Sequence, residues 1–350
     1  MGEVFLYFLR LGATVFGGVG PQLAAMRRDL VDERRWVTPA EFDRGVALAY
    51  LCPGPVGTQA GVYLGWLRGG APGATAALFG FLLVPFLLVT GLAAAHARFG
   101  SGGAFGASVA GMRAAVVPVI ALSAVRLFRA SLSAPRERWA AGAAFAWCLL
   151  RPRDATLAVI GSGVFLAVLS TRLGRRGAAA ATLPAVLLVG LQAGALVYGT
   201  GQAILPIVRE AAVVRRGWLT DAQFTDAVSA GLVTPGPVVM AVAYVGFVAR
   251  GWAGALVAAL GAFAPGWLLV LLVGPRMEAL EKDARLKAFA RGATAAAIGG
   301  VAAATCGLAA STLDSPRPVA LAAASAAAVL LGAPDAAAIA ACGLLSAALR

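Results

Sequence analysis

The triplet Pro-Gly-Pro occurs twice inside long apolar stretches of this sequence, at residues 53–55 and 235–237. Proline lacks a backbone N–H and glycine is a poor helix former, so a helix cannot run undisturbed through either triplet. A helix that starts after such a break exposes unpaired N–H groups and a partial positive charge, which attract anions. The two triplets are therefore candidate anion-binding sites. The candidate residues are Pro53, Gly54, Pro55, Thr58 and Gln59 in the first copy, and Thr234, Pro235, Gly236 and Pro237 in the second.

Two glycine-rich segments, residues 16–22 and 198–202, provide a second set of candidates. Glycine lets a ligand or a neighbouring helix approach the backbone closely. Close helix packing is the alternative interpretation. An uncharged amide in an apolar stretch needs a polar partner, however, and this favours a polar site. The candidate ligand-binding residues here are Gly17, Gly18, Gly20, Gln22, Gly199, Gly201 and Gln202.

Three of the charged residues in or beside the apolar runs are functional candidates. Arg113 falls inside the run 104–128, and a charge near the bilayer centre is a functional candidate by default. Its rigid set of donors suits a tetrahedral oxyanion, unless the helix starts later and the side chain reaches a headgroup instead. Asp43 and Asp226 flank the Pro-Gly-Pro triplets and are candidates for carrying a coupling proton, with solvated acids at helix starts as the alternative.

The residues that would support metal or enzyme chemistry are scarce. His96 is the single histidine, which leaves little from which to build a metal site or a histidine proton relay. The four cysteines show no Cys-x-x-Cys spacing, and no nucleophile–base pair or nucleotide-binding loop is evident. We therefore expect no metal, no cofactor and no enzymatic activity.

The composition is that of a membrane protein. Hydrophobic residues make up 60% of the chain and charged residues 13%, with a mean hydropathy of +0.83. Lys and Arg total 29 against 16 acids, but they lie mostly between apolar runs, as expected for loops and headgroup contacts rather than nucleic-acid binding. We predict a multi-pass protein of the plasma (inner) membrane, with the lipid bilayer as a partner and no nucleic-acid partner.

The chain repeats itself at an offset of about 182 residues. Gly12 matches Gly194, Trp36 matches Trp218, and the first Pro-Gly-Pro triplet matches the second. We predict two homologous units, residues 1–177 and 178–350. The apolar runs lie at 4–26, 43–67, 72–95, 104–128, 139–150 and 154–170 in the first unit, and at 183–208, 225–249, 252–275, 288–310, 317–332 and 334–349 in the second.

The predicted fold class is an all-α polytopic membrane protein with about five transmembrane helices and one re-entrant hairpin per unit. The arm at residues 43–52 would span about 15 Å, half of a hydrocarbon core of about 30 Å, which places the triplet near the midplane. A kinked continuous helix is the alternative. Positive charge concentrates after the run 104–128 in the first unit but before the run 288–310 in the second, so the repeats are predicted to be inverted.

The ordered motifs resemble the chromate ion transporter family in its two-domain, long-chain form. They are Phe-Gly-Gly-x-Gly-Pro at 16–21, Arg-Trp-x-Thr-x-x-Glu-Phe at 35–42 and Leu-x-Pro-Gly-Pro at 51–55, with second copies at 198–202, 217–220 and 234–237. The resemblance implies chromate transport, usually outward, with the isosteric sulfate as a competitor. It also implies that the glycine segments, both triplets and Arg113 form the oxyanion site. The second unit lacks the counterpart of Thr58 and Gln59, which argues against symmetric roles.

The functional hypothesis is chromate efflux giving chromate resistance, by alternating access around a midplane oxyanion site. A secondary transporter of sulfate or another inorganic anion, and an uncoupled anion channel, are the alternatives. The sequence leaves open whether a second copy of the chain is a partner in a homodimer.

Overall fold

The computed structural model describes the chain except for residues 101, 133–134, 151–179, 277–282 and 350. The described residues form helices and connecting turns without a strand, which confirms the all-α prediction. Among the described residues, four helical segments are long and apolar enough to cross a membrane, so the chain is a polytopic membrane protein. They are Val56–Phe99, Gly103–Ala130, Val238–Arg276 and Lys287–Thr312.

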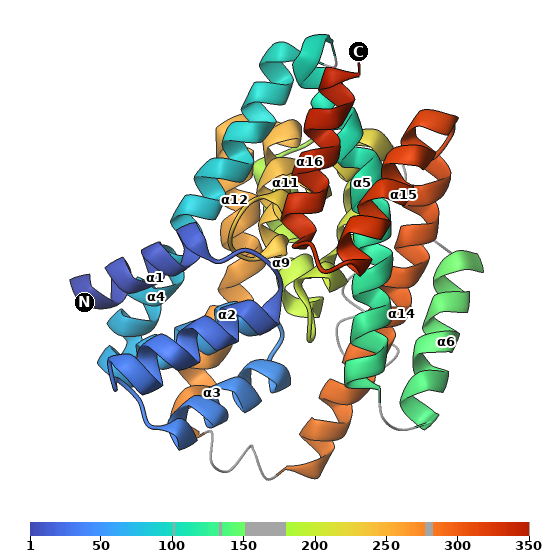
Figure 1. The fold of residues 1–350 in the computed structure, drawn as a ribbon. Helices are drawn as coiled ribbons and strands as arrows, with labels where there is room; N and C mark the ends of the chain where they lie inside the picture. Colours follow the sequence, from blue (N-terminus) through green and yellow to red (C-terminus); the bar gives the residue numbers. More distant parts are fainter. Residues whose placement is uncertain (101, 133–134, 151–179, 277–282, 350) are drawn as a thin grey trace.

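The helices follow the same order in both halves of the chain (Figure 1). The first half contains α1 (Gly2–Thr14), α2 (Val19–Met26), the π-helix η1 (Arg27–Glu33), α3 (Pro39–Leu51), α4 (Val56–Phe99), α5 (Gly103–Ser131) and α6 (Pro135–Leu150). The second contains α9 (Leu183–Leu196), η3 (Gly201–Ala203), α10 (Ile204–Val208), η4 (Arg209–Val214), α11 (Asp221–Val233), η5 (Val238–Met240), α12 (Ala241–Val273), η6 (Gly274–Arg276), α14 (Ala284–Thr312), α15 (Pro316–Leu330) and α16 (Asp335–Ala348). The predicted run 154–170 and the predicted boundary after residue 177 lie outside the described residues.

The first Pro-Gly-Pro triplet is the tip of a helical hairpin, which we call the first tip (residues 53–55). Helix α3 ends at Leu51, and α4 begins at Val56 and runs back along α3. Gly45 of α3 is so close to the Tyr63 ring of α4 that an added Cβ would lie 2.7 Å from it. The chain therefore reverses at the triplet, and the alternative of a kinked continuous helix is wrong.

The arm α3 is longer than expected because its N-terminal cap lies further back in the sequence. The Thr38 side chain accepts a hydrogen bond from the Glu41 amide, and the Glu41 carboxylate accepts one from the Thr38 amide, closing a capping box. The helix consequently starts at Pro39 and spans 13 residues, about 20 Å. In the second half, Thr220 and Gln223 form the same capping box at the start of α11.

The second triplet forms the second tip (residues 235–237) between α11 and α12. Both hairpins then continue into a long membrane-spanning helix through a sharp kink. Gly70 has φ +60° and ψ −149°, and Gly251 has φ +63° and ψ −154°. Only glycine adopts this region of conformational space readily, so the kinks depend on these two residues.

The opening helix of each half is broken, which the sequence did not settle. Helix α1 ends at Thr14 before α2 starts at Val19, and α9 ends at Leu196 before η3 starts at Gly201. The glycine-rich segments lie in these breaks. The predicted runs 4–26 and 183–208 are therefore not single helices, and each half contains two interrupted helices.

The two halves run in opposite directions. In Figure 1, α4 ends at the top, where α5 begins, whereas α12 ends at the bottom, near the start of α14. The largest buried core cluster combines side chains of both halves, among them Ile120, Leu205 and Phe224. The halves are thus packed against each other along an apolar interface.

Each tip contacts the break in the opening helix of the other half. The Gly54 amide donates a hydrogen bond of 2.7 Å to the Val197 carbonyl, and the Gly236 amide donates one of 3.1 Å to the Val15 carbonyl. Gly54 and Gly236 are equivalent in the repeat, as are Val15 and Val197. Such a reciprocal pair of contacts is the signature of an approximate two-fold axis. All four breaks therefore meet in the middle of the protein.

The tips also contact the long helices of the opposite halves. The second tip lies against the Pro85 ring of α4, which an added Cβ at Gly236 would overlap. The first tip lies against α12, where a Cβ at Gly266 would come 2.9 Å from the Pro53 carbonyl oxygen and overlap the Gln59 amide. Each hairpin is thereby held by the other half of the chain.

Candidate anion cavity between the halves

A cavity of about 320 Å³ lies where the breaks meet. Its volume is at the small end of the range for ligand sites, which is roughly 300–1,000 Å³. Both opening-helix breaks and the second tip contribute to its wall, together with the end of α5 and the start of α16. The residues that line it are Gly17, Gly18, Val19, Gly20, Gln22, Leu23, Tyr50, Pro55, Ser123, Arg126, Leu127, Ala130, Thr200, Gly201, Gln202, Gly231, Leu232, Thr234, Gly236, Pro237, Val238 and Asp335.

Most of the candidate residues from the glycine segments and the second tip line this cavity. They are Gly17, Gly18, Gly20, Gln22, Gly201, Gln202, Thr234, Gly236 and Pro237, and Pro55 joins them from the first tip. Pro53, Gly54, Thr58, Gln59, Gly199, Pro235 and Arg113 are not part of the wall. Their roles as substrate ligands stay predictions.

The first tip uses its polar groups differently from the second. Gln59 Nε2 donates a hydrogen bond of 3.2 Å to the Pro53 carbonyl, and its amide occupies the space left by Gly266. The Thr58 hydroxyl is buried without a hydrogen-bond partner in the described structure. Gln59 braces the hairpin against α12, and the sequence alone could not assign it that neighbour.

Two glutamines reach the cavity from the opening-helix breaks. Gln22 Nε2 donates a hydrogen bond of 3.2 Å to the Gly236 carbonyl, linking the first half to the second tip. Gln202 is buried, and its Oε1 has no hydrogen-bond partner among the described residues. The expectation that Gln22 needs a polar partner agrees with this contact, while Gln202 keeps an acceptor available for water or a protonated ligand.

One helix N-terminus opens at the cavity. Val19 and Gly20 belong to the first turn of α2 and line the wall. Pro55, the N-cap of α4, lines it too, but proline has no backbone N–H to donate. The first amide groups of a helix have no partner within the helix and carry partial positive charge. The start of α2 therefore makes the cavity wall electropositive without a basic side chain.

Arg126 supplies the basic side chain of the described cavity wall. It lies near the C-terminal end of α5 and forms an ion pair with Asp335 at the first position of α16, with 3.3 Å between NH1 and Oδ1. The Arg126 side chain is 53% exposed, so the pair is accessible and weak. Sequence analysis used this residue only as part of the positive charge after the run 104–128. Its position at the end of an apolar run gave no sign of the cavity.

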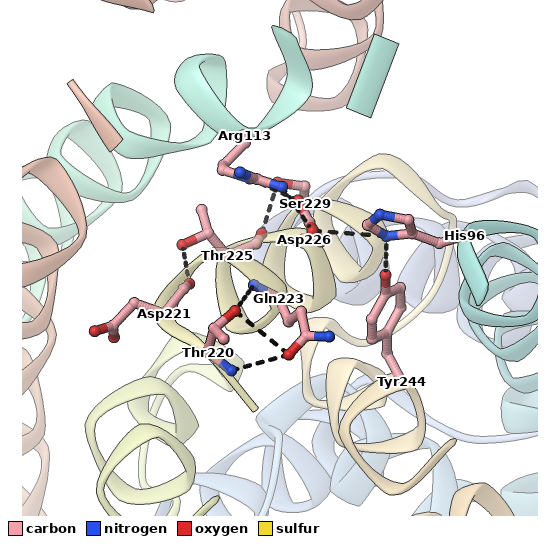
Figure 2. Close-up of polar contacts among 9 residues, drawn as sticks. All are labelled: His96, Arg113, Thr220, Asp221, Gln223, Thr225, Asp226, Ser229 and Tyr244. Carbon is pink, nitrogen blue, oxygen red and sulfur yellow. Dashed lines mark hydrogen bonds and ion pairs between the residues drawn. The ribbon is translucent and has the colours of Figure 1, made fainter. Parts of the chain in front are cut away.

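Arg113 is engaged elsewhere, in a group that we call the inter-half cluster: Arg113, Asp226, His96 and Tyr244 (Figure 2). The guanidinium donates two hydrogen bonds to the Asp226 carboxylate, 2.8 Å from Nε and 2.9 Å from NH2. The Asp226 side chain is only 2% exposed. Such a paired, fork-like arrangement is the strongest form of ion pair in proteins.

His96 completes this cluster, although the sequence suggested that a single histidine had little to act with. Its Nδ1 lies 2.6 Å from the Tyr244 hydroxyl and 3.6 Å from Asp226 Oδ2. Helices α4 and α5 of the first half carry His96 and Arg113, and α11 and α12 of the second half carry Asp226 and Tyr244. The cluster therefore joins the two halves.

Asp43 and Asp226, the two candidate proton carriers predicted from the sequence, have different surroundings. Asp43 is 65% exposed and lies 3.1 Å from Arg27, whereas Asp226 is buried in the inter-half cluster. The repeat offset of 182 aligns Asp226 with Arg44, not with Asp43. The described residues also contain no group of three or more His, Cys, Asp or Glu side chains placed to hold a metal ion.

The family model for chromate transporters matches residues 2–183 and, a second time, residues 184–347. The chain belongs to the chromate transporter family. It is 36% identical to the chromate transport protein of Cupriavidus metallidurans, over 85% of this chain and 80% of that protein. It is 34% identical to a probable chromate transport protein of Synechococcus elongatus, over 84% and 80% of the two chains.

A further relative is the chromate transport protein of Pseudomonas aeruginosa, 32% identical over 85% of this chain and 78% of that protein. These relatives are named as transport proteins, and the four long apolar helices agree with a multi-pass membrane member of the family. The family predicted from the ordered motifs is thus confirmed. No solved structure matches this chain at a significant level.

Proposed function

We propose that this protein transports chromate out of the cell across the plasma (inner) membrane and so confers chromate resistance. The observation that carries the proposal is the cavity at which breaks from both halves meet, because broken helices in a membrane occur where they line a polar pathway. The names of the relatives supply the substrate. Transport rather than enzymatic chemistry is the role that this cavity fits.

The cavity suits a small dianion. The helix N-terminus of α2 provides amide donors, and Arg126 provides a full positive charge with several N–H groups. In the structure Asp335 holds that charge. A tetrahedral oxyanion would compete with Asp335 for Arg126, so the carboxylate acts as an internal substitute that the substrate displaces.

The architecture supports alternating access as the mechanism. Two inverted repeats, which we place at residues 1–177 and 178–350, enclose a site between them, and each repeat has a hairpin with a glycine kink next to it. The hairpin tips would lie near the membrane midplane. Rocking one half against the other about this point would expose the cavity to one side of the membrane and then to the other.

Two other functions use the same cavity. A transporter of sulfate or another inorganic anion differs only in preference, and sulfate shares the tetrahedral shape of chromate. An uncoupled anion channel differs in mechanism, and its flux would not respond to an imposed ion gradient. The hydrogen-bonded contact between each tip and the opposite half favours a transporter over a permanently open pore.

Radiolabelled chromate uptake into proteoliposomes tests the proposal. Replacing Arg126 with Ala removes charge-assisted contacts worth about 1.5–3 kcal/mol, so we expect the KM for chromate to rise by about ten- to a hundredfold. The matched control is Arg129→Ala, which removes an exposed arginine from the same helix end outside the cavity wall. Wild-type uptake by Arg126→Ala, or no uptake by the wild-type protein, would contradict the proposal.

A further inference from the structure

His96 is held between a hydroxyl and a carboxylate from the other half of the chain. Its Nδ1 is 2.6 Å from the Tyr244 oxygen, within hydrogen-bond distance, and 3.6 Å from Asp226 Oδ2, slightly beyond it (Figure 2). Both partners are almost fully buried, while His96 itself keeps 17% of its side chain exposed. The imidazole is therefore the accessible member of this group, whereas the two groups that it contacts are buried.

Protonation of this imidazole changes what it can bind. A neutral imidazole has one donor and one acceptor nitrogen, so its contact with the Tyr244 hydroxyl satisfies either tautomer. Imidazolium donates at both nitrogens and carries a positive charge. It is then attracted to the Asp226 carboxylate, which lies within 1 Å of hydrogen-bonding distance and at present receives both hydrogen bonds from Arg113.

Among the described residues, the other charged and titratable side chains around His96 belong to the same cluster. Helix α5 contributes Arg113 and the apolar ring of Phe105, α11 contributes Asp226, and α12 contributes Tyr244. A second cation beside Asp226 must share the carboxylate with Arg113. The grip of Arg113 on Asp226 is therefore coupled to the charge of His96.

This coupling would be transmitted to the cavity through α11. Asp226 lies eight residues before Thr234, about 12 Å along the helix, and Gly231, Leu232 and Thr234 of the same helix segment line the cavity. Arg113 and His96 belong to the first half, so loosening their contact with Asp226 frees α11 and the second tip to move. The cluster thus links a proton-binding residue to the hairpin arm that shapes the anion site.

We propose that His96 is the proton-binding residue that couples chromate movement to a pH gradient, acting through Asp226 and Arg113 on the contact between the halves. One proton binds the imidazole from one side of the membrane and leaves it after the halves have moved. The inference rests on the proposed transport function, but proton binding at His96 can be measured without transport.

Because His96 is the single histidine of the chain, protein labelled with ¹⁵N-histidine and carrying a histidine-free tag gives one imidazole signal by NMR. We expect this signal to change when the pH is lowered and the imidazole takes up a proton. We also expect saturating chromate to shift the pH at which it changes, because linked sites affect each other reciprocally. A signal that does not titrate, or a titration that chromate leaves unmoved, would overturn the proposal.

Transport measurements provide the second test. In proteoliposomes, wild-type chromate flux should respond to an imposed pH gradient, whereas His96→Gln should carry chromate down its own gradient with no such response. Chromate itself takes up a proton in mild acid, so both proteins are compared at identical pH on each side. An unchanged response in His96→Gln refutes the coupling role. If the wild-type protein moves no chromate, the proposed function fails, and the NMR titration still shows whether the site binds a proton.

Discussion

Replacing Arg113 with Ala distinguishes its two interpretations. From its place in an apolar run this residue is predicted to bind the oxyanion, whereas in the structure its guanidinium donates hydrogen bonds of 2.8 and 2.9 Å to Asp226. If Arg113 binds only Asp226, its removal leaves a carboxylate that is 2% exposed without its main partner. The protein should then lose stability as well as transport.

The size of the loss follows from the burial of the two partners. Breaking a buried ion pair by removing one partner costs about 3–5 kcal/mol, because an uncompensated charge stays buried. Asp226→Asn should cost less, about 1–3 kcal/mol, since it leaves no charge in the buried position and Arg113 is 26% exposed and can be hydrated. The double variant Arg113→Ala/Asp226→Asn should therefore be more stable than Arg113→Ala alone.

The assay is thermal unfolding of the four proteins in one detergent, combined with chromate uptake after reconstitution. A structural role predicts that the double variant regains stability and a measurable part of the chromate flux down its gradient. A substrate-binding role predicts that Arg113→Ala has near wild-type stability and that the double variant stays inactive. The second pattern would refute the assignment of Arg113 to the inter-half cluster and restore it to the oxyanion site.

Two further predictions concern the cavity and the first tip. Asp335→Asn removes the carboxylate that competes with the anion for Arg126. Exposed ion pairs are worth about 0.2–1 kcal/mol, so the KM for chromate in proteoliposome uptake should fall by up to about fivefold. A raised KM would contradict this expectation. Gly266→Ala places a methyl group where the Gln59 amide lies and should lower the free energy of unfolding in detergent by about 1–3 kcal/mol. The double variant Gly266→Ala/Gln59→Ala should recover part of that stability. No recovery would show that the clash lies elsewhere.

The elements of the fold could be predicted from the sequence because their signals are local. A proline and glycine triplet ends a helix whatever surrounds it, and a capping box such as that of Thr38 and Glu41 starts one. The repeat offset then showed that the two hairpins are equivalent. The break in each opening helix was less predictable, since glycine-rich sequence is also typical of continuous, closely packed membrane helices.

The sequence could not predict which arginine lines the cavity and which belongs to the inter-half cluster. Arg113 pairs with a residue 113 positions away, and Arg126 with one 209 positions away. A charge in the middle of an apolar run is more conspicuous than one at its end, so sequence analysis selected Arg113 and treated Arg126 as a loop charge. The deciding factor is the partner that each side chain meets, and this depends on how two inverted halves pack together.

The tips leave fewer free amide donors for an anion than the sequence suggests. Their central amides, on Gly54 and Gly236, already donate to the carbonyls of Val197 and Val15. An amide engaged in a short hydrogen bond is not available to a ligand without breaking that bond. The donors left for an oxyanion are the helix start of α2 and the guanidinium of Arg126.

If the halves rock as proposed, the two equivalent hydrogen bonds would be strained or relaxed together, because they are related by the approximate two-fold axis. The inter-half cluster breaks this equivalence, since Asp226 aligns with Arg44 and has no acidic counterpart in the first half. In the proposed mechanism, the ion pair of Arg113 and Asp226 therefore favours the conformation in which it forms. A proton on His96 adds a second cation of the first half beside Asp226 and would change the balance between the two conformations.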